Sequence, residues 1–444
     1  MALSMEEPKH SLIIVGHPGI GKTIFLFYVL TYRLQRGLST FYQKNAHSVL
    51  YFHKSGVYSI PANQEPDSVD WESDDIWSLF DSNRTVKEPG ELIGGDHAEW
   101  VLIEAASPRR ERWREWPKYK GFVHFYYMKS PSFAEVVMIH PHQKNPVGTE
   151  QDLYRFYQLY GPSIRDAFRH ASPSSILAYQ GTVATALTNL GYGGLLQAVG
   201  EAKKLDMEEG SHKIFRVEPS SDSRRQYVVS VITDEVMKMV WEMYLEGQTE
   251  RVAEFATLFA SRPFSRSTVG WIVDTHIHPI LLQAETRTFH PIQGLVRGIN
   301  VHYSYPGPTA MQFPDVEVQI PNLDHCSFSM NDPTTDFQLN CYYQSKEKNN
   351  ATFDALTFTQ EKGQNYVTMY QVTLWKEHDV REKGLTLLDK YLDLPKGTAS
   401  MPSPRIRYVL VALKGEEVKS VFPRDWVENR WKGILDVYAL EIEF

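Results

Sequence analysis

The sequence predicts an α/β protein whose N-terminal part is built on a parallel β-sheet with helices on its faces. Two observations support this class. Short apolar runs recur along the first 130 residues, and several of the connections between them are long enough to hold a helix. Parallel strands need such crossover connections. The runs lie at residues 12–15, 48–52, 57–60, 76–81, 100–103 and 122–127.

A glycine-rich stretch follows the first of these runs. Residues 16–23 (GHPGIGKT) match the pattern G-x-x-x-x-G-K-[ST] without a mismatch, and the apolar residues 24–30 after them can open a helix. Strand, glycine loop and helix in this order are the context that supports such a match. The sequence therefore predicts the sheet of a P-loop NTPase. The alternative is a glycine turn that binds nothing.

The residue types in this loop suit the binding of ATP and Mg²⁺. Gly16, Gly19 and Gly21 allow backbone N–H groups to face phosphate oxygens without a side-chain clash. Lys22 is expected to reach the β- and γ-phosphates, and the Thr23 hydroxyl is expected to be a ligand of Mg²⁺. The helix that follows adds the positive end of its dipole.

Asp81 is the second residue expected at the metal and in catalysis. It ends the apolar run 76–81, and an acid at the carboxyl end of a buried strand is where this fold holds Mg²⁺. Many related ATPases place a water-activating glutamate next, whereas Ser82 stands here. Asn83 and Glu104 are therefore the remaining candidates for orienting water. A helix cap is the alternative role for Asp81.

Residues 107–120 form the most basic segment of the chain, with six basic residues against two acids. Trp113, Trp116 and Tyr119 are interleaved with these charges. One interpretation is contact with nucleic acid through charge and base stacking. Another is a solvated surface.

Arginines are also candidates for stabilising charge on the γ-phosphate. Arg109 or Arg110 in the basic segment can take this role, and Arg165 is a further candidate phosphate sensor. The alternative for Arg165 is a surface position on a helix.

Composition limits the class of protein. A chain of 444 residues is expected to form two or three domains. Its 42% hydrophobic and 23% charged residues are typical of a globular protein. The net charge of -8 argues against a surface that coats DNA throughout, but permits a local basic groove. Its two cysteines do not form a disulfide framework, which favours a reducing compartment.

No signal peptide or membrane-spanning run is visible in the sequence. We therefore expect an intracellular location, cytoplasm or nucleus, and no membrane partner. Export as an effector and formation of a homo-oligomer are left open.

Downstream, helical patterns give way to strands. A helical part with one strand pair extends to a composition break at residues 262–265, and a helix over 267–282 opens the strand-rich part. We predict a P-loop domain at 1–171, a helical linker domain at 172–263 and a third domain at 264–444. The predicted helices are 132–171, 174–206, 233–259 and 379–392. The predicted strands are 212–217, 227–231, 292–303, 316–320, 326–330, 352–359, 365–373, 406–413 and 437–444, and a polar turn is predicted at 344–350.

Polar residues on these elements suggest a second site. Asp274, Asp354 and Gln371 offer two acids and an amide oxygen, which around Mg²⁺ suit hydrolysis of a phosphodiester. A turn or cap is the alternative role for a single strand-end aspartate. His276 and His278 do not share a helix face, so a two-histidine metal clamp is not expected there.

Taken in order, these motifs resemble a known family. The chain is similar to P-loop ATPase and nuclease-like proteins related to Crinkler effectors and retrotransposon hot spot proteins, of the type found in basidiomycete fungi. The resemblance rests on residues 13–23 with 28–30, 77–83, 106–109, 160–165, 353–356 and 370–373 with His378.

The resemblance implies an α/β restriction-endonuclease-like C-terminal domain of the PD-(D/E)XK type. Asp274 then takes the helix-acid position, Asp354 is the metal aspartate and Gln371 replaces the second acid. Thr373 stands where the family has lysine, and Lys376 is a candidate substitute.

The expected function is ATP binding and hydrolysis coupled to Mg²⁺-dependent cleavage or binding of DNA. One alternative is a nucleotide-switched, DNA-binding regulatory effector without catalysis, which Ser82 and Thr373 favour. A kinase-type phosphotransferase is a second alternative, although it gives the strand-rich C-terminal part no role.

Overall fold

The structure is a computed structural model that describes residues 10–68, 71, 75–119, 122–207, 210–260, 267–292, 295–297, 300–305, 314–329, 337–346, 352–373, 377–380, 404–415, 418–423 and 435–443. The chain divides into two compact units. The first is Met1–Met243 with Ser261–Ser265, and the second is Tyr244–Ala260 with Arg266–Phe444. The three predicted domain ranges stay predictions.

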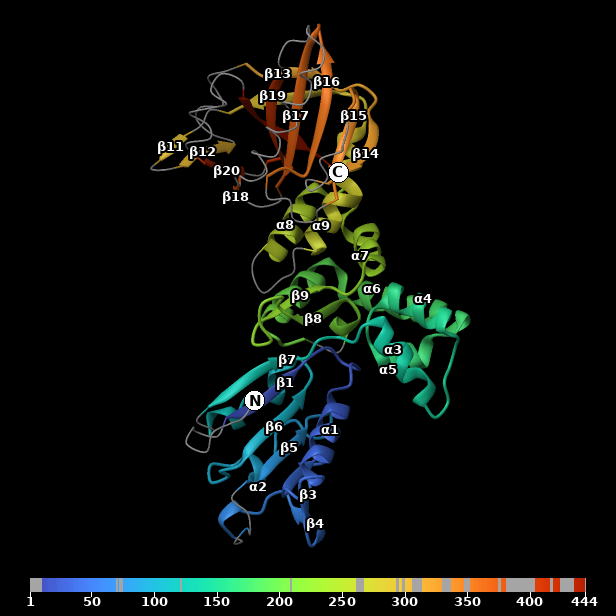
Figure 1. Ribbon diagram of the computed structural model, residues 1–444, viewed down its shortest axis with the longest axis vertical. Coiled ribbons are helices and arrows are strands. Elements are labelled where there is room, and N and C mark those ends of the chain that lie inside the picture. The colour runs from blue at the N-terminus through green and yellow to red at the C-terminus, as the bar shows by residue number, and fades with distance from the viewer. Residues whose placement is uncertain are drawn as a thin grey trace. The chain divides into compact units, whose positions relative to one another are not determined.

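The first unit contains a seven-stranded sheet among its described residues, in the order β4-β3-β2-β5-β6-β1-β7 (Figure 1). The five strands from β2 to β7 in this order pair in parallel, whereas β3 and β4 form an antiparallel hairpin on β2. This confirms the α/β class and the parallel sheet. The strands are β1 (Ser11–Val15), β2 (Thr40–Gln43), β3 (Ser48–His53), β4 (Gly56–Pro61), β5 (Trp77–Asp81), β6 (Val101–Ala106) and β7 (Val123–Tyr127).

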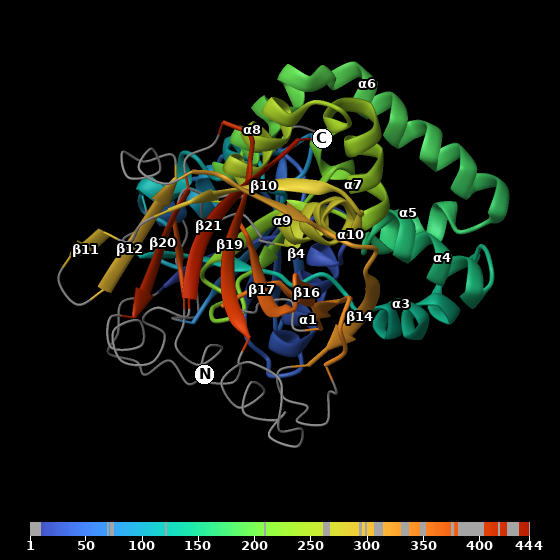
Figure 2. The ribbon, with the colours of Figure 1, turned by 90° about the horizontal axis from the view of Figure 1, so that it is seen from above.

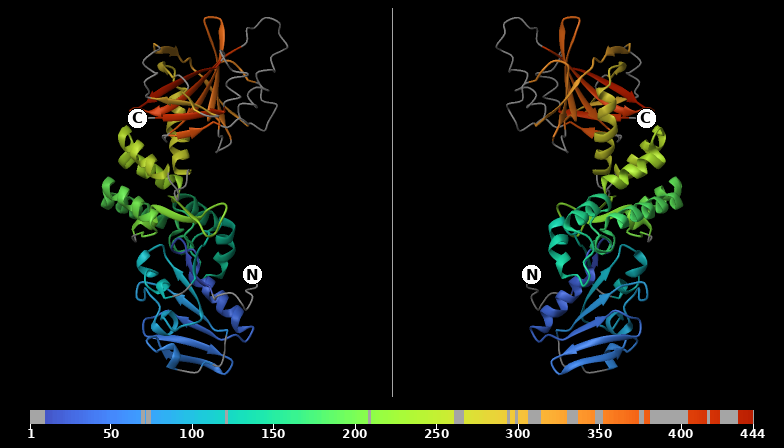
Figure 3. Two further views of the ribbon diagram at one scale, coloured as in Figure 1. Left: turned by 90° about the vertical axis from the view of Figure 1, so that its left-hand side faces the viewer. Right: turned by 90° about the vertical axis from the view of Figure 1, so that its right-hand side faces the viewer.

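The helix α1 (Lys22–Leu34) follows β1 and lies along one face of this sheet (Figure 3). It buries Leu26, Val29 and Leu30 in a cluster that also contains Ile14 of β1 and Leu79 of β5. Because parallel strands are covered on both faces, β1 and β6 are almost continuously apolar. The packing of α1 therefore fixes the loop between β1 and α1 at the carboxyl edge of the sheet.

Helices and one hairpin complete the first unit. Capping boxes at Ser132 and Thr149 begin α3 and α4, and α6, in the range of the predicted helix 174–206, is kinked at Gly191. The described elements are α2 (Glu91–Gly94), α3 (Phe133–Ile139), α4 (Glu150–Tyr160), α5 (Ile164–His170), α6 (Pro173–Lys203), β8 (Phe215–Pro219), β9 (Tyr227–Val231) and α7 (Asp234–Val240).

The second unit contains an eight-stranded mixed sheet, in the order β13-β10-β21-β19-β17-β16-β15-β14, and a four-stranded sheet, β11-β12-β20-β18, among its described residues. Figure 2 shows β21, β19, β17 and β16 side by side. The elements are α8 (Thr249–Ala260), α9 (Ser267–Ile272), α10 (His278–Leu282), β10 (Thr286–Pro291), β11 (Leu295–Arg297), β12 (Asn300–Tyr305), β13 (Val316–Gln319), β14 (Asp324–Phe328), β15 (Cys341–Ser345), β16 (Ala355–Glu361), β17 (Gln364–Val372), β18 (Glu377–Asp379), β19 (Arg405–Leu413), β20 (Val418–Pro423) and β21 (Leu435–Ile442).

Several predicted boundaries were wrong. The predicted helix 233–259 is interrupted by a π-helical turn, Trp241–Leu245, which precedes α8. Gln344 belongs to β15 instead of a turn, because Tyr342 and Tyr343 beside it are buried in the sheet. Asp379 ends β18, so the predicted helix does not begin there. Its remaining residues 381–392, the predicted boundary at 262–265 and Lys376 lie outside the described residues.

The α/β class is the part of the fold prediction that the structure confirms. The assignments of the first sheet to the P-loop NTPases and of the second unit to the restriction-endonuclease fold stay predictions. None of the helices in the described ranges combines the length and the apolar character that a membrane span requires.

Candidate functional site

The glycine loop lies at the carboxyl end of β1 and leads directly into α1. Gly19 and Gly21 have φ angles of +81° and +103°, a left-handed conformation that glycine adopts readily. The Lys22 ammonium donates to the carbonyl oxygens of Gly16 and His17, at 2.7 and 2.8 Å. No side chain caps the start of α1 at Gly21. Its first N–H groups are therefore oriented as in an anion-binding helix terminus.

Thr23 and Asp81 meet beside this loop. The Thr23 hydroxyl donates to Asp81 Oδ1 at 3.0 Å, so the start of α1 is joined to the carboxyl end of β5. Burial raises the pKa of Asp81, and the hydrogen bond from Thr23 and the charges of Lys44 and Lys22 oppose that rise. A hydroxyl and a carboxylate are the hard oxygen donors that Mg²⁺ prefers, so this pair fits the expected metal.

Positive charge gathers around Lys22. Arg165 lies in the first turn of α5, and its backbone N–H donates to Gly19 O at 3.3 Å. Burial, followed by the charges of Arg165 and Arg112, lowers the pKa of Lys22 to about 7, while Asp81 acts in the opposite direction. The structure therefore brings the glycine loop, Thr23, Asp81 and Arg165 together.

Arg109 belongs to the same cluster of charges. Its guanidinium lies 3.9 Å from Glu111 and influences the pKa values of Arg112 and His212. Arg110 lies in a 3₁₀ turn, Arg110–Arg112, where its backbone N–H donates to Asp206.

Three members of this cluster were missed from the sequence. Arg112 is buried and donates from Nη1 to Ser82 O at 2.8 Å. His17 and His212 are buried with their ring centroids 6.1 Å apart, and no described residue hydrogen-bonds to the Nδ1 atom of either. Burial, with Lys22 and Arg216, lowers the pKa of His17 to about 3. His17 lies within the predicted glycine loop and Arg112 within the basic segment, but nothing in the sequence relates them to each other or to His212, because only tertiary folding brings the three together.

The basic segment does not present its tryptophans to nucleic acid. Trp113 and Trp116 are only 6% and 2% exposed. Trp113 packs against Phe125, and Trp116 donates from its indole to Glu104 at 2.5 Å. The prediction of base stacking is therefore wrong for these two residues, which belong to the core. Tyr119 remains 53% exposed.

The two candidates for orienting water are engaged elsewhere. Glu104 is fully buried, and burial raises its pKa well above the usual value, which favours the neutral carboxyl over a carboxylate that could activate water. Asn83 donates its amide to Asp81 O and Lys44 O, and its oxygen accepts from Thr85. Asn83 therefore fixes the turn after β5.

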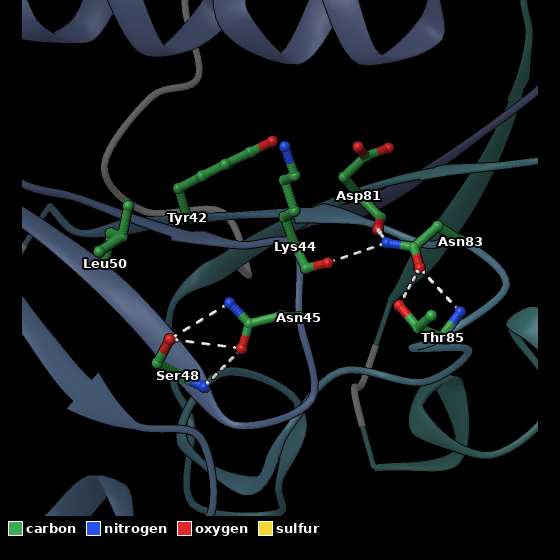
Figure 4. A pocket seen from close by; sticks show the side chains of 8 residues that line it. All are labelled: Tyr42, Lys44, Asn45, Ser48, Leu50, Asp81, Asn83 and Thr85. Carbon is green, nitrogen blue, oxygen red and sulfur yellow. Dashed lines mark hydrogen bonds between the residues drawn. The ribbon is translucent and has the colours of Figure 1, made fainter.

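A pocket of about 490 Å³ opens beside Asp81, between the ends of β2 and β5. Figure 4 shows the tips of Tyr42 and Lys44 directed to the same edge of the pocket as the Asp81 carboxylate. The Tyr42 hydroxyl is buried without a hydrogen-bond partner in the described ranges, and burial raises its pKa to about 12. The pocket is lined by Tyr42, Lys44, Asn45, Ser48, Leu50, Asp81, Asn83 and Thr85.

A second cluster lies in the second unit, where Asp354 immediately precedes β16. Asp354 Oδ2 accepts from the Val372 N–H at 2.7 Å and from Gln371 Nε2 at 2.8 Å. The Oε1 atom of Gln371 is buried and lacks a partner among the residues that the structure describes. Burial is the main cause that raises the pKa of Asp354 to about 7.

Asp274 lies close enough to Asp354 for its charge to contribute to this rise in pKa. It is part of a π-helical turn, Val273–Ile277, and accepts from Gln344 Nε2 at 3.2 Å. His278 Nε2 lies 3.9 Å from Asp274, while its Nδ1 pairs with the Tyr342 hydroxyl at 2.5 Å. The structure thus brings Asp274, Asp354 and Gln371 into one cluster.

The donor set of this second cluster is two carboxylates and an amide oxygen, which fits a hard cation such as Mg²⁺. Within the described residues, no group of three or more histidine, cysteine or acidic side chains is placed to hold a metal. Thr373, at the position where the related family has lysine, is buried, and its N–H donates to Val411 O.

Comparison with known proteins supports a Crinkler-like relationship. Crinkler effector proteins 15 and 16 of Phytophthora infestans are each 27% identical to the chain over 129 residues. The match covers 29% of this chain and 20% of each relative. The chain therefore spans about a fifth of the length of the curated relatives that it matches. No protein-family model matches the chain. The Crinkler-like part of the resemblance is confirmed, whereas the nuclease-like architecture and the fungal type stay predictions.

Proposed function

We propose that the first unit binds ATP with Mg²⁺ at the glycine loop. One observation carries this proposal: the cations of Lys22, Arg112 and Arg165 converge on a left-handed glycine loop beside the Thr23–Asp81 pair. Like charges held together in a buried place repel one another, and a polyphosphate would relieve that repulsion.

The chemistry of each side chain suggests its role in the proposed site. The loop N–H groups and Lys22 would hold the phosphates, and Thr23 and Asp81 would hold Mg²⁺. The metal ion neutralises phosphate charge and so supports phosphoryl transfer. Arg109 and Arg165 would add positive charge near the phosphates.

Titration of the full chain with Mg²⁺ and ATP tests this proposal. The Lys22→Ala variant is expected to lose at least about tenfold in affinity, because hydrogen bonds between charged groups contribute about 1.5–3 kcal/mol. Lys144→Ala is the matched control, since Lys144 is exposed in the turn before α4. Equal affinity of wild type and Lys22→Ala for ATP would contradict the assignment.

For the second unit we propose Mg²⁺-dependent action on DNA through Asp274, Asp354 and Gln371, in a restriction-endonuclease-like fold. The buried Oε1 atom of Gln371 beside Asp354 supports this proposal. Nicking of plasmid DNA with Mg²⁺ or Mn²⁺ is expected from wild type and from the control Asp324→Asn, whose side chain is exposed on β14. It is expected to be lost in Asp354→Ala. Nicking that survives this change would assign it to another site or to a contaminant.

A nucleotide-switched, DNA-binding regulatory protein without catalysis is the second candidate. It is favoured by the burial of Glu104, which raises the pKa of its carboxyl, and by the engagement of Asn83, which together leave the strand ends poor in groups to activate water. DNA binding that depends on ATP, with neither phosphate release nor nicking, would support it. In either case we propose an effector role like that named for the Crinkler relatives.

A further inference from the structure

We propose that Arg112 binds the terminal phosphate of the bound nucleotide and so distinguishes a nucleoside triphosphate from a diphosphate. This inference rests on the proposed binding of ATP at the glycine loop. It concerns a residue that the loop motif does not include.

Arg112 is a buried cation whose hydrogen-bond partner is neutral. Its side chain donates from Nη1 to the carbonyl oxygen of Ser82 at 2.8 Å, and its Nε atom has no partner in the described part of the chain. Arg114, two residues further on, is 68% exposed and pairs with Glu115 at 3.3 Å. One turn of the basic segment therefore directs one arginine inward and leaves the other at the surface.

The acids nearest Arg112 are paired with other groups. Glu104 accepts from the Trp116 indole, and burial raises its pKa, which favours its neutral form. Glu111 is nearly half exposed and pairs with Lys87 at 2.6 Å. No carboxylate among the described residues forms a hydrogen bond or an ion pair with this guanidinium. A buried cation without a paired anion is costly, and an incoming anion removes that cost.

The hydrogen bond to Ser82 O locates Arg112 beside the metal pair, because Ser82 directly follows Asp81 in the chain. The guanidinium is also near enough for its charge to act on Lys22 and on Asp81. In glycine loops of this pattern the lysine reaches the β- and γ-phosphates, and the metal bridges oxygens of the same two groups. A guanidinium close to both residues therefore faces the γ-phosphate, which a diphosphate lacks.

The hydrogen bond to Ser82 O fixes the position of the Arg112 guanidinium. Ser82 follows Asp81, and its own N–H donates to Ala105 O of β6. The guanidinium is thus held against the carboxyl ends of two sheet strands, so little side-chain freedom is lost when a phosphate binds. Its planar, forked donors match phosphate oxygens better than a lysine ammonium does.

The test compares the affinities for ATP and ADP, both with Mg²⁺, of the full chain and its variants. Arg112→Gln removes the charge but retains a donor for Ser82 O. Arg112→Lys retains the charge but removes the fork, and Arg114→Gln is the matched control. For Arg112→Gln we expect a loss of about 10- to 100-fold in ATP affinity. ADP affinity is expected to change less than about threefold, and Arg112→Lys to lose ATP affinity by an intermediate factor.

A merely structural role of Arg112 gives a different result, because it would weaken ATP and ADP binding by the same factor. That outcome, or unchanged ATP affinity in Arg112→Gln, overturns the inference while leaving nucleotide binding intact. If wild type binds neither nucleotide, the proposed function fails and the inference falls with it. If Arg112→Gln does not fold, the ratio of ATP to ADP affinity in Arg112→Lys decides by the same criterion.

Discussion

Binding of ATP at pH 8 is expected to draw a proton from solvent onto Lys22. In the free protein, burial and the charges of Arg165 and Arg112 lower the pKa of this ammonium to about 7. Roughly nine tenths of the protein therefore carries a neutral Lys22 at pH 8. Phosphate oxygens favour the charged form and return its pKa toward the usual value.

The structure gives the size of this uptake. Complete reprotonation on binding amounts to about 0.9 proton per site at pH 8, about 0.5 at pH 7 and about 0.1 at pH 6. The nucleotide contributes little to the uptake at pH 8, because the second pKa of a phosphate group is about 6.

Isothermal titration calorimetry at pH 8 measures this number directly. The observed heat is compared in HEPES and in Tris, whose ionisation enthalpies differ, and the slope gives the protons taken up. Lys22→Arg is the control, because a guanidinium stays charged at this pH and takes up no proton. A slope near zero in wild type, or the same slope in Lys22→Arg, would refute the electrostatic description of the loop.

Three further predictions concern stability. Gly19→Ala is expected to destabilise the protein more than Gly21→Ala in urea unfolding: both have positive φ, but only at Gly19 would a Cβ lie 2.4 Å from Ser163 Oγ. Equal losses would contradict this. Because the folded pKa of His17, about 3, lies below its unfolded value of 6.5, the stability that depends on its neutral form is present above pH 6.5 and is lost as the pH falls toward 3. Between pH 7 and pH 4 wild type should lose about 3 kcal/mol more than His17→Gln, and parallel pH profiles would exclude this. Glu104→Gln should change the free energy of unfolding at pH 7 by less than about 1 kcal/mol, because burial raises the pKa of this carboxyl and favours its neutral form, which an amide replaces without loss of charge. A large loss would indicate an ionised carboxylate.

Much of the fold could be predicted from local pattern. The runs that became β1 and β6 hold four consecutive apolar residues, at 12–15 and 100–103, which is the pattern of strands covered on both faces. The runs that became β5 and β7 are each interrupted by one polar residue, Ser78 and His124. The strand β2 was missed because its four residues, TFYQ, mix polar and aromatic types. Local pattern did not predict that the polar residues Thr40 and Gln43 would be fully buried in this strand.

The candidate sites divide in the same way. Lys22, Thr23 and Asp81 were identified because a fixed spacing and a strand end suffice to relate them. The position of Glu104 near a strand end suggested a group that orients water. In the structure its carboxyl is fully buried and accepts a hydrogen bond from the Trp116 indole, and burial raises its pKa. The burial of Glu104 depends on Trp116, twelve positions further along the chain, and on how the segment between these two residues packs.

By itself, the sequence determined the phosphate-loop pattern of residues 16–23, the strand and helix around it, and the polar residues Asp81, Asp354 and Gln371 at strand ends. These features are local, because backbone geometry and apolar periodicity operate over a few residues. Only the tertiary structure decided that Arg112 and His212 join the loop and that Trp113 and Trp116 do not face solvent. The reason is that burial and charge act through space: the order β5-β6-β1 brings together side chains from distant segments, and their pKa values follow from that proximity.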